Sequence, residues 1–481
     1  MRKRLSRLAL GVSLSSLAAL LLTLPFWGHW ILFGRAVDPV LYDYHEMVLY
    51  ATDLYLWAAL GGWVVSRLLS RNRARLQWGP AFLTIPLLLV VIVSAVSSAQ
   101  AVDPTYAAYT TVRLAFLPVL YLMLINAPLR HGLIVWPLAA GMVIQGAVGV
   151  PQFLLGHTLG LEWLGETVAN AASPGVSVVM AGGQRWLRAY GLTPHPNILG
   201  GVVMASLLIA AGSYLTLAGQ RRIALLGSLA IGLGTLLVTF SRAAWLGLAV
   251  GGLILLGLLW WSSKARRPST QLVKSALAPL VGLGLAVVVI FGAVNWPLIR
   301  PRLGLTSEGV EIRSVGERVM LNDAALVLIR ARPWLGVGLG DFPVALLRLA
   351  PETVSYYSSF TPVHIVLLLA TAELGFLGGL LWLALIGSPW VALWLRRKQV
   401  RMTPWWAGLS AAIAALTVVS FFDHYPWSFQ QGRLILCLVC GCMGNMTGIE
   451  NSSATFPKPS MIPAMRSLTS TFSALCEVAR I

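Results

Sequence analysis

Charged residues are scarce in this sequence. Only 11% of its 481 residues are Asp, Glu, Lys or Arg, and 57% are hydrophobic, whereas about a quarter of a typical soluble protein is charged. This shortage excludes an ordinary soluble globular protein and predicts an integral membrane protein. The net charge of +18 does not indicate a nucleic-acid partner, because the basic residues lie in short clusters between apolar runs, as they do in membrane-protein loops.

Cysteines are also few, and familiar nucleotide-binding motifs are missing. The sequence contains no Walker-type loop and no dinucleotide fingerprint, so any group-transfer substrate must arrive already activated. We expect no cofactor and no metal. The apolar run "LILCLVCGC" favours small side chains packing a helix over a zinc site, and no disulfide framework is visible. The four cysteines all lie near the C-terminus, at Cys437, Cys440, Cys442 and Cys476.

Long apolar runs are abundant. Because a helix needs ~20 apolar residues to cross the hydrocarbon core, the runs predict an all-α polytopic membrane protein with about 12 transmembrane helices. The basic N-terminus has no clear cleavage site after its apolar stretch, so we expect an uncleaved first span. The twelve expected helices lie near residues 9–33, 47–66, 79–98, 108–127, 132–153, 197–217, 223–240, 243–261, 275–294, 363–385, 404–422 and 432–446.

The basic clusters predict the orientation. They fall on one side of the expected helices, which is the cytoplasmic side by the positive-inside rule. The termini are then cytoplasmic and a large outward-facing loop region precedes the tenth helix. We expect four parts: helices 1–5 in residues 1–153, a core in 154–385 with outer loops 154–196 and 295–362, C-terminal helices in 386–446, and a flexible cytoplasmic tail in 447–481.

The outer loops carry arginine without lysine. A guanidinium group is planar and matches phosphate oxygens with two hydrogen bonds, whereas an ammonium group is a point charge. Taken singly, most of these arginines could simply bind lipid head groups, so only those inside motifs are candidates for function.

The motif "RWLRAYGLTPHPN" contains the first candidates. Pro194 and Pro196 place His195 in an extended turn, and Asn197 is expected to cap the next helix. Arg188 lies just before this turn. An arginine beside a helix N-terminus forms an anion site, although a membrane-interface loop with a capping asparagine explains the motif equally well.

Two further arginines lie in distinctive places. Arg242, in "FSRAAWLGL", is expected at a tight outer turn between two apolar helices, where it either reaches lipid head groups or points inward as a fixed positive charge. Arg318 precedes a segment whose apolar spacing predicts an amphipathic helix on the outer surface. The Gly-rich stretch "RPWLGVGLGDF" follows that segment.

Ionisable residues occupy the span "TPVHIVLLLATAELGFLGGL". A group of this kind in a membrane segment is a functional candidate by default. His364 lies at the outer end, where a neutral imidazole can act as a general base, or where a hydrogen-bonded interface residue can lie. Glu373 is nine residues further on, which places it on the opposite face of a straight helix, ~13 Å along the axis. We therefore expect Glu373 to bond other helices.

The last polar block is "FFDHYPWSFQQGR". Asp423 and His424, with the neighbouring Tyr425 and Trp427, offer the hydrogen-bonding and aromatic groups that suit a sugar ring. An aromatic belt at the membrane interface explains the rings equally well.

The order of these motifs resembles a known family. The pieces "RAYGLTPHPN", "SRAAWL", "RPWLGVGLGDF" and "HIVLLLATAELGFLG", between about Arg188 and Gly378, are similar to the O-antigen ligase and O-antigen polymerase superfamily. Members are glycosyltransferases of the bacterial plasma membrane that face outward. They move a glycan from an undecaprenyl-diphosphate carrier to a lipid, glycan or protein acceptor, as in lipopolysaccharide biosynthesis, without nucleotide sugar or metal.

The resemblance implies roles for the matching positions only. Arg188 and Arg242 match arginines that hold the carrier diphosphate, and Arg318 is a weaker match to an arginine of the large outer loop. His364 matches the histidine that serves as base. The family commonly has Asn after that histidine, whereas Ile365 follows here, so no role is carried over to Ile365. Support or acceptor binding is left to His195, Asn197, Glu373, Asp423 and His424.

Two rival functions remain open. Within the superfamily, a ligase and a polymerase differ only in the acceptor, and the sequence does not separate them. A flippase or transporter of twelve helices is the rival from another class, and it would predict charged pairs near the bilayer midplane and repeat-related broken helices.

Overall fold

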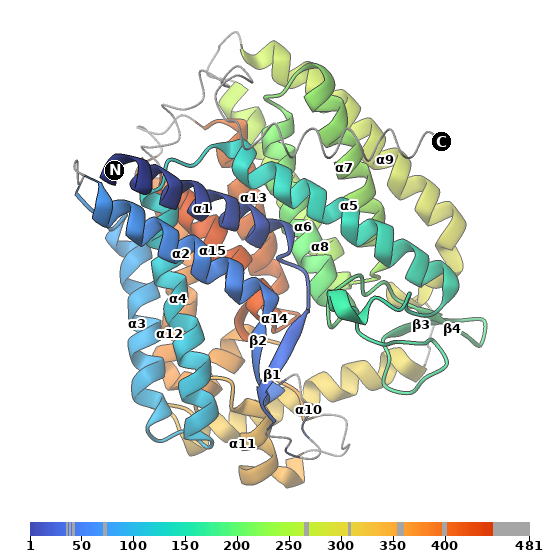
Figure 1. Ribbon diagram of the computed structural model, residues 1–481. Coiled ribbons are helices and arrows are strands. Elements are labelled where there is room, and N and C mark those ends of the chain that lie inside the picture. Colours follow the sequence, from blue (N-terminus) through green and yellow to red (C-terminus); the bar gives the residue numbers. More distant parts are fainter. Residues whose placement is uncertain are drawn as a thin grey trace.

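The computed structural model describes residues 1–34, 37, 40, 44–70, 75–263, 269–305, 309–353, 360–396 and 402–445. The expected cytoplasmic tail, residues 447–481, lies outside the described residues. The fold is mostly helical, as predicted, and most helices run roughly along one bundle axis (Figure 1).

Among the described residues, nine helices are long and apolar enough to cross a membrane. This finding supports a polytopic membrane protein but not a count of twelve spans. The remaining three expected ranges coincide with α2 (Ala51–Leu69), α13 (Pro404–Val419) and α15 (Gln430–Gly444). The nine helices are α1 (Arg2–Leu22), α3 (Ala81–Ser98), α4 (Pro104–Asn126), α5 (His131–Leu155), α6 (Pro196–Tyr214), α7 (Gly219–Val238), α8 (Arg242–Ser263), α9 (Ser269–Arg302) and α12 (Val366–Arg396).

The core of the bundle is α6. Its side chains are buried along almost its whole length, which is expected of a helix that is apolar on every side. Helices α8 and α13 pack closely on it because glycines remove side chains at the contacts. A Cβ on Gly212 would lie 2.5 Å from the carbonyl oxygen of Pro404, and one on Gly408 would lie 2.8 Å from that of Leu208. Small residues at helix contacts are the usual means of close packing in membranes.

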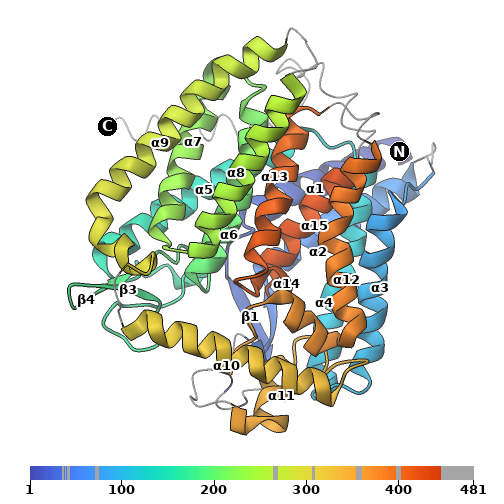
Figure 2. The same ribbon diagram turned by 180° about the vertical axis from the view of Figure 1, so that it is seen from behind.

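One end of the bundle collects the segments between the long helices. We call it the loop end; it lies at the bottom of Figures 1 and 2. Helix α10 (Gly309–Ala331) crosses this end at a steep angle to the bundle, beside α11 (Phe342–Leu349) (Figure 2). The amphipathic-helix prediction thus falls within α10, which begins earlier than expected. The other elements of the loop end are η2 (Glu162–Leu164), η3 (Pro351–Thr353) and α14 (Tyr425–Ser428).

Two short hairpins at the loop end were not anticipated. β1 (His29–Phe33) pairs antiparallel with β2 (Met47–Tyr50), and β3 (Val178–Ala181) with β4 (Gln184–Leu187). The expected first span, 9–33, is wrong at its end, because the helix stops at Leu22 and the chain continues into β1. The apolar residues of β1 look like part of a span, but all four occupy exposed strand positions.

Helix α12 is broken, and the break holds a Gly-rich loop. Gly375 has φ +71 and ψ −172 inside the helix. The loop Trp334–Gly340 docks into this break through backbone hydrogen bonds: Val337 N–H donates to the Ala372 carbonyl (2.9 Å) and Gly338 N–H to the Glu373 carbonyl (3.0 Å). The non-helical turn thus has its freed backbone groups satisfied by the loop, as a buried backbone requires.

Asp341 ends this loop and makes the stability of the protein pH-dependent. Its Oδ2 accepts a hydrogen bond from Asp103 N–H (2.6 Å). Burial raises the pKa of Asp341 to about 8, and the charges of Asp103 and Glu373 act in the same direction. The native state therefore holds a proton that the unfolded chain loses near pH 4, so stability should fall as pH rises from about 4 to about 8.

We expect the free energy of unfolding to drop by ~2–5 kcal/mol between pH 5 and pH 9 because of this group. Asp341→Asn retains the accepting oxygen and removes this titration, so its stability should fall less than that of the wild-type protein over that range. Thermal unfolding in detergent at both pH values measures the difference. Equal pH dependence of the two proteins would contradict the prediction.

Candidate active site

His364 lies at the loop end, directly before α12. The start of this helix is fixed by Val366 N–H, which donates to the carbonyl oxygen of Ser420 at the end of α13 (2.9 Å). The His364 residue is half-buried, and its Nδ1 atom is buried with no hydrogen-bond partner among the described residues. Its ring faces the ring of His424 edge-on, with 5.5 Å between centroids. The imidazole is thus left available for a ligand.

A hydrogen-bonded chain leads from the His424 segment to Arg188. Asn197 Nδ2 donates to Asp423 Oδ2 (2.6 Å), and Asn197 Oδ1 accepts from Arg188 Nη2 (2.5 Å). Asp423 is the neighbour of His424 in sequence. Of the nine predicted site residues, these contacts join five: Arg188, Asn197, Asp423, His424 and His364.

The expected role of Asn197 as helix cap is wrong. The N-cap of α6 is His195, whose Nδ1 accepts a hydrogen bond from the backbone N–H of Asn197 (3.2 Å). Because Nδ1 accepts, the ring proton is on Nε2, which donates to Ser177 Oγ (2.8 Å). The cap shifts to the histidine because Pro196 already supplies the first helical residue, and this frees the Asn197 amide to bridge two other residues.

His424 is held in one orientation by Ser428. The Ser428 hydroxyl donates to the His424 carbonyl (3.1 Å) and therefore accepts from His424 Nδ1 (2.6 Å). This arrangement leaves the proton on Nδ1 and the lone pair on Nε2. Because His424 faces His364, both rings can accept a proton at this place.

The turn between α7 and α8 is held by two arginines. Its Phe240 has a φ of +48, a conformation that costs a non-glycine residue ~1–3 kcal/mol. Arg188 Nε donates to the Thr239 carbonyl (2.7 Å), and Arg302 Nη2 to the Phe240 carbonyl (2.6 Å). Arg242 begins α8 at this turn and is half-buried. The expected tight turn before Arg242 is therefore present.

Arginines and one carboxylate act on the histidines. Burial lowers the pKa of His364, the charges of His424 and Arg318 lower it further, and Asp423 acts in the opposite direction. Burial also lowers the pKa of His195 well below its usual range, with Arg188 and Arg302 among the further causes. Arg318 of α10 acts on all three histidines, including His424. The site thus combines neutral imidazoles with several guanidinium groups, which suits an anionic ligand.

Glu373 lies apart from this cluster. Its carboxylate accepts hydrogen bonds from the Trp427 indole (2.7 Å) and from the backbone N–H groups of Gly340 and Phe342. It therefore fastens the Gly-rich loop and α14 to the broken helix. Glu373 thus contacts other elements of the bundle. Because α12 is broken at Gly375 and His364 precedes the helix, the expected placement of the two residues on opposite faces of one straight helix does not apply.

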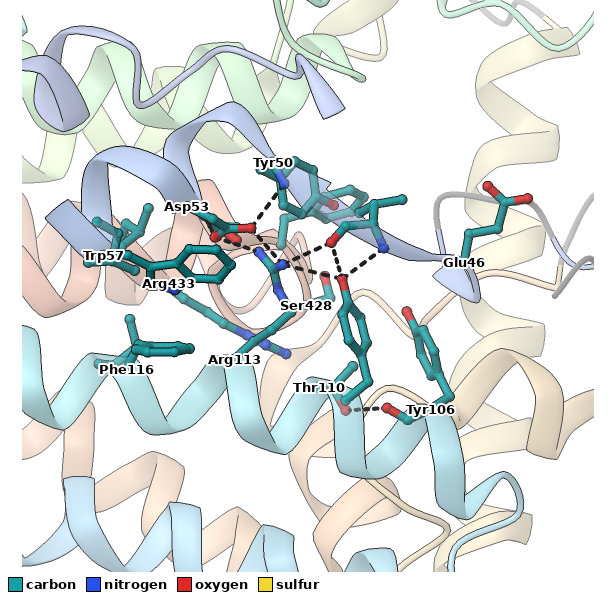
Figure 3. Close-up of a pocket in the computed structure, with 17 residues that line it drawn as sticks. Glu46, Tyr50, Asp53, Trp57, Tyr106, Thr110, Arg113, Phe116, Ser428 and Arg433 are labelled. Carbon is teal, nitrogen blue, oxygen red and sulfur yellow. Dashed lines mark hydrogen bonds and ion pairs between the residues drawn. The ribbon is translucent and has the colours of Figure 1, made fainter. Parts of the chain in front are cut away.

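Sequence reasoning missed several charged residues at the loop end. Arg302 is one. Arg113 of α4 and Asp53 of α2 form another group: a buried ion pair with two hydrogen bonds, of 2.8 and 3.1 Å (Figure 3). Arg113 and Asp53 each interrupt an apolar segment, and this interruption was the signal in the sequence that could have identified them as candidates. Their pairing joins two helices, so the sequence of either helix alone does not predict it.

Residues 227–383 match the family described as O-antigen ligase. This match supports an O-antigen ligase-like domain in that region of the chain. The matched region begins in α7, includes Arg242, Arg318, His364 and Glu373, and ends in α12. An O-antigen ligase domain within a bundle of apolar helices indicates a glycosyltransferase-type enzyme in a membrane. No curated protein matches the chain.

Within the O-antigen ligase match, the site is only partly covered. Arg188, His195 and Asn197 precede residue 227, and Asp423 and His424 follow residue 383. The hydrogen-bonded chain thus lies wholly in the unmatched parts, and the edge-on ring contact between His424 and His364 connects it to the matched region.

Proposed function

We propose that this protein moves a glycan from an undecaprenyl-diphosphate carrier to an acceptor hydroxyl, with inversion at the anomeric carbon. The reaction takes place on the outer face of the bacterial plasma membrane, at the loop end, and needs no metal. The observation that carries the proposal is the series of contacts Arg188–Asn197–Asp423 and His424–His364, which connects a guanidinium group to an imidazole pair at one end of a membrane bundle.

The chemistry follows from these groups. His364 takes the proton of the acceptor hydroxyl as its oxygen bonds to the anomeric carbon. The bond between that carbon and the diphosphate breaks on the opposite face, and the polyprenyl diphosphate leaves with the electron pair. Arg188 and Arg242, with Arg318 of α10, stabilise the charge that develops on the leaving group. His195 and Asp423 position Asn197 and Arg188.

The transporter alternative has one observation in its favour, because α12 is a broken helix. In a transporter, such a break coordinates the substrate. Here the break is filled by the Gly-rich loop, whose N–H groups take up the exposed carbonyls. The carbonyls at the break are therefore bonded within the protein, which favours a structural role for the break over coordination of a substrate.

Transfer by purified protein tests the proposal. Protein in detergent is given a labelled polyprenyl-diphosphate oligosaccharide with candidate acceptors and a chelator. The expected result is release of polyprenyl diphosphate together with label on the acceptor, whereas a nucleotide sugar gives no product. Absence of donor cleavage with every acceptor, alongside movement of the carrier lipid across liposomes, would replace this proposal with the flippase alternative.

The lowered pKa of His364 predicts an unusual pH profile. A free histidine loses its proton near pH 6.5, but this imidazole stays neutral at lower pH because its charged form is disfavoured. The transfer rate should therefore remain high down to about pH 5. Arg318→Gln removes a nearby positive charge, so the acid limb should shift to higher pH.

Arg330→Gln is the matched control, since Arg330 is exposed on the same helix. Its profile should coincide with that of wild type. An acid limb centred near pH 6.5 in the wild-type protein, or an identical limb in Arg318→Gln, would show that His364 does not titrate as the base.

A further inference from the structure

A leucine-rich cavity lies beside the core helix α6, among α7, α8 and α9 (Figures 1 and 2). Its volume is about 140 Å³, and its lining consists of leucine, alanine and glycine. Most of the lining residues on α7, α8 and α9 are only half-buried, so the cavity is open to the surroundings of the bundle. A leucine-lined cavity of roughly this size stays dry and takes a small hydrocarbon group. In a membrane, part of a lipid chain therefore fills it.

Two polar side chains continue the lining toward the end of the bundle opposite the loop end. On α6, Leu207 and Ala211 line the cavity, and Tyr214 follows one turn after Ala211 on the same face. On α7, Arg222 lies one turn before Leu226, which also lines the cavity. The Arg222 guanidinium lies over the Tyr214 ring, with 5.9 Å between Cζ and the ring centroid. The two side chains thus meet at one end of the cavity.

Both side chains have polar atoms without a partner. Arg222 Nε donates to the carbonyl oxygen of Leu217 (2.7 Å), but Arg222 Nη2 is buried and has no hydrogen-bond partner among the described residues. Tyr214 is fully buried, and its hydroxyl makes no hydrogen bond to any residue that the structure describes. Leaving such groups unpaired is costly. A charged donor beside a neutral one matches the oxygens of an anion.

The start of α7 also favours an anion. The helix begins at Gly219, and its N-cap residue Ala218 makes no side-chain hydrogen bond to the first backbone N–H groups. Arg221 and Arg222 lie in the first turn, where no acidic residue accompanies them. Basic residues at this place are opposed by the positive end of the helix dipole. A phosphate group would offset this repulsion, because it accepts from both a guanidinium group and a helix N-terminus.

The phosphate cannot be that of a glycan donor bound at His364. Helix α6 begins at Pro196, beside the candidate active site, and Tyr214 is its last residue. Its 19 residues give a length of ~28 Å. A lipid phosphate at Arg222 therefore lies at the far end of the bundle from His364. In the proposed orientation this end is cytoplasmic, where basic pockets between helices bind lipid head groups.

We propose that α6, α7 and α9 bind a phospholipid of the leaflet opposite His364. Its phosphate accepts hydrogen bonds from Arg222 and the Tyr214 hydroxyl, and one acyl chain enters the leucine-rich cavity. The chain then joins α9 to the core of the bundle, because Leu280 and Leu283 of α9 line the same cavity as Leu207 of α6. The inference is independent of the proposed transfer reaction.

Native mass spectrometry of the purified protein tests the phosphate end of the site. Phosphatidylglycerol, or diacylglycerol with the same chains, is added to delipidated protein in detergent. The wild-type protein should retain at least about tenfold more phosphatidylglycerol, because only this lipid carries the phosphate. Arg222→Gln should lose the preference. Arg130→Gln, at an exposed position before α5, is the matched control and should keep it.

Two substitutions on α7 test the chain end of the site. Ala230 lines the cavity, so Ala230→Phe fills it and should lower the retention of phosphatidylglycerol. Ala224→Phe, at an exposed position of the same helix, should not. Added phosphatidylglycerol should raise the unfolding temperature of the wild-type and Ala224→Phe proteins more than that of Ala230→Phe, since a ligand of the native state stabilises it.

Two outcomes would overturn the inference. One is equal retention of phosphatidylglycerol by Arg222→Gln and the wild-type protein. The other is displacement of phosphatidylglycerol by an equal concentration of polyprenyl phosphate, which would assign the cavity to an isoprenoid chain. Retention that survives this competition and depends on both Arg222 and the open cavity would establish the phospholipid site.

Discussion

His364→Ala is expected to lower the rate of glycan transfer by about 10³-fold, since a positioned general base contributes ~10²–10⁴-fold. Donor binding should persist, because the arginines that we propose to hold the diphosphate remain. The KM for the donor is then unchanged while kcat falls. Steady-state transfer by purified protein, with the fold checked by size exclusion, measures both quantities.

His157→Ala is the matched control for this substitution. His157 is an exposed histidine of the loop 154–196, and its replacement should leave transfer intact. If His364→Ala transferred glycan at the wild-type rate while His424→Ala did not, the base would be His424, whose ring contacts that of His364. Normal rates in both variants would remove the imidazole pair from the mechanism.

Gly375→Ala is expected to lower the free energy of unfolding by about 3 kcal/mol or more. The added Cβ would lie 2.1 Å from the carbonyl oxygen of Trp334 and 2.7 Å from that of Pro333. The position also has a φ of +71, which costs a non-glycine residue ~1–3 kcal/mol, and overpacking adds ~1–3 kcal/mol. The Gly-rich loop would be pushed out of the helix break.

Gly387→Ala separates this effect from a general intolerance of α12. Gly387 lies in the same helix, and a Cβ there would meet nothing within 4 Å. Its thermal stability in detergent should equal or slightly exceed that of wild type, since alanine is the better helix former. A Gly375→Ala protein as stable as Gly387→Ala would mean that the loop does not depend on this contact.

Local patterns were enough to predict much of the molecule. Apolar runs located the long helices, because every helix that crosses a membrane needs about the same length and a mostly apolar composition. The Ser241–Arg242 pair marked a turn, because the run around it was about twice the length of one span. Arg188 and His364 were selected by short motifs whose order resembles one family, and the structure joins them through contacts that the motifs do not contain.

The rest depended on contacts between distant segments. In the sequence, Gly375 looks like an ordinary glycine in an apolar helix. Its positive φ is required only by the loop that docks at the helix break, which the sequence does not show. Asn197 looked like a helix cap because Asp423, its partner, lies 226 residues away in sequence. Strand β1 was absorbed into the first expected span and β2 into the second, since apolar strands and membrane helices share a composition.

Anomeric configuration is the measurement that tests the shared site most directly. If the acceptor attacks from the His364 side while the arginines hold the departing diphosphate on the other, one displacement inverts the anomeric carbon. NMR of the product made from a donor of known configuration should show the opposite configuration at the new linkage. Retention of configuration would contradict direct displacement between a base and an anion site.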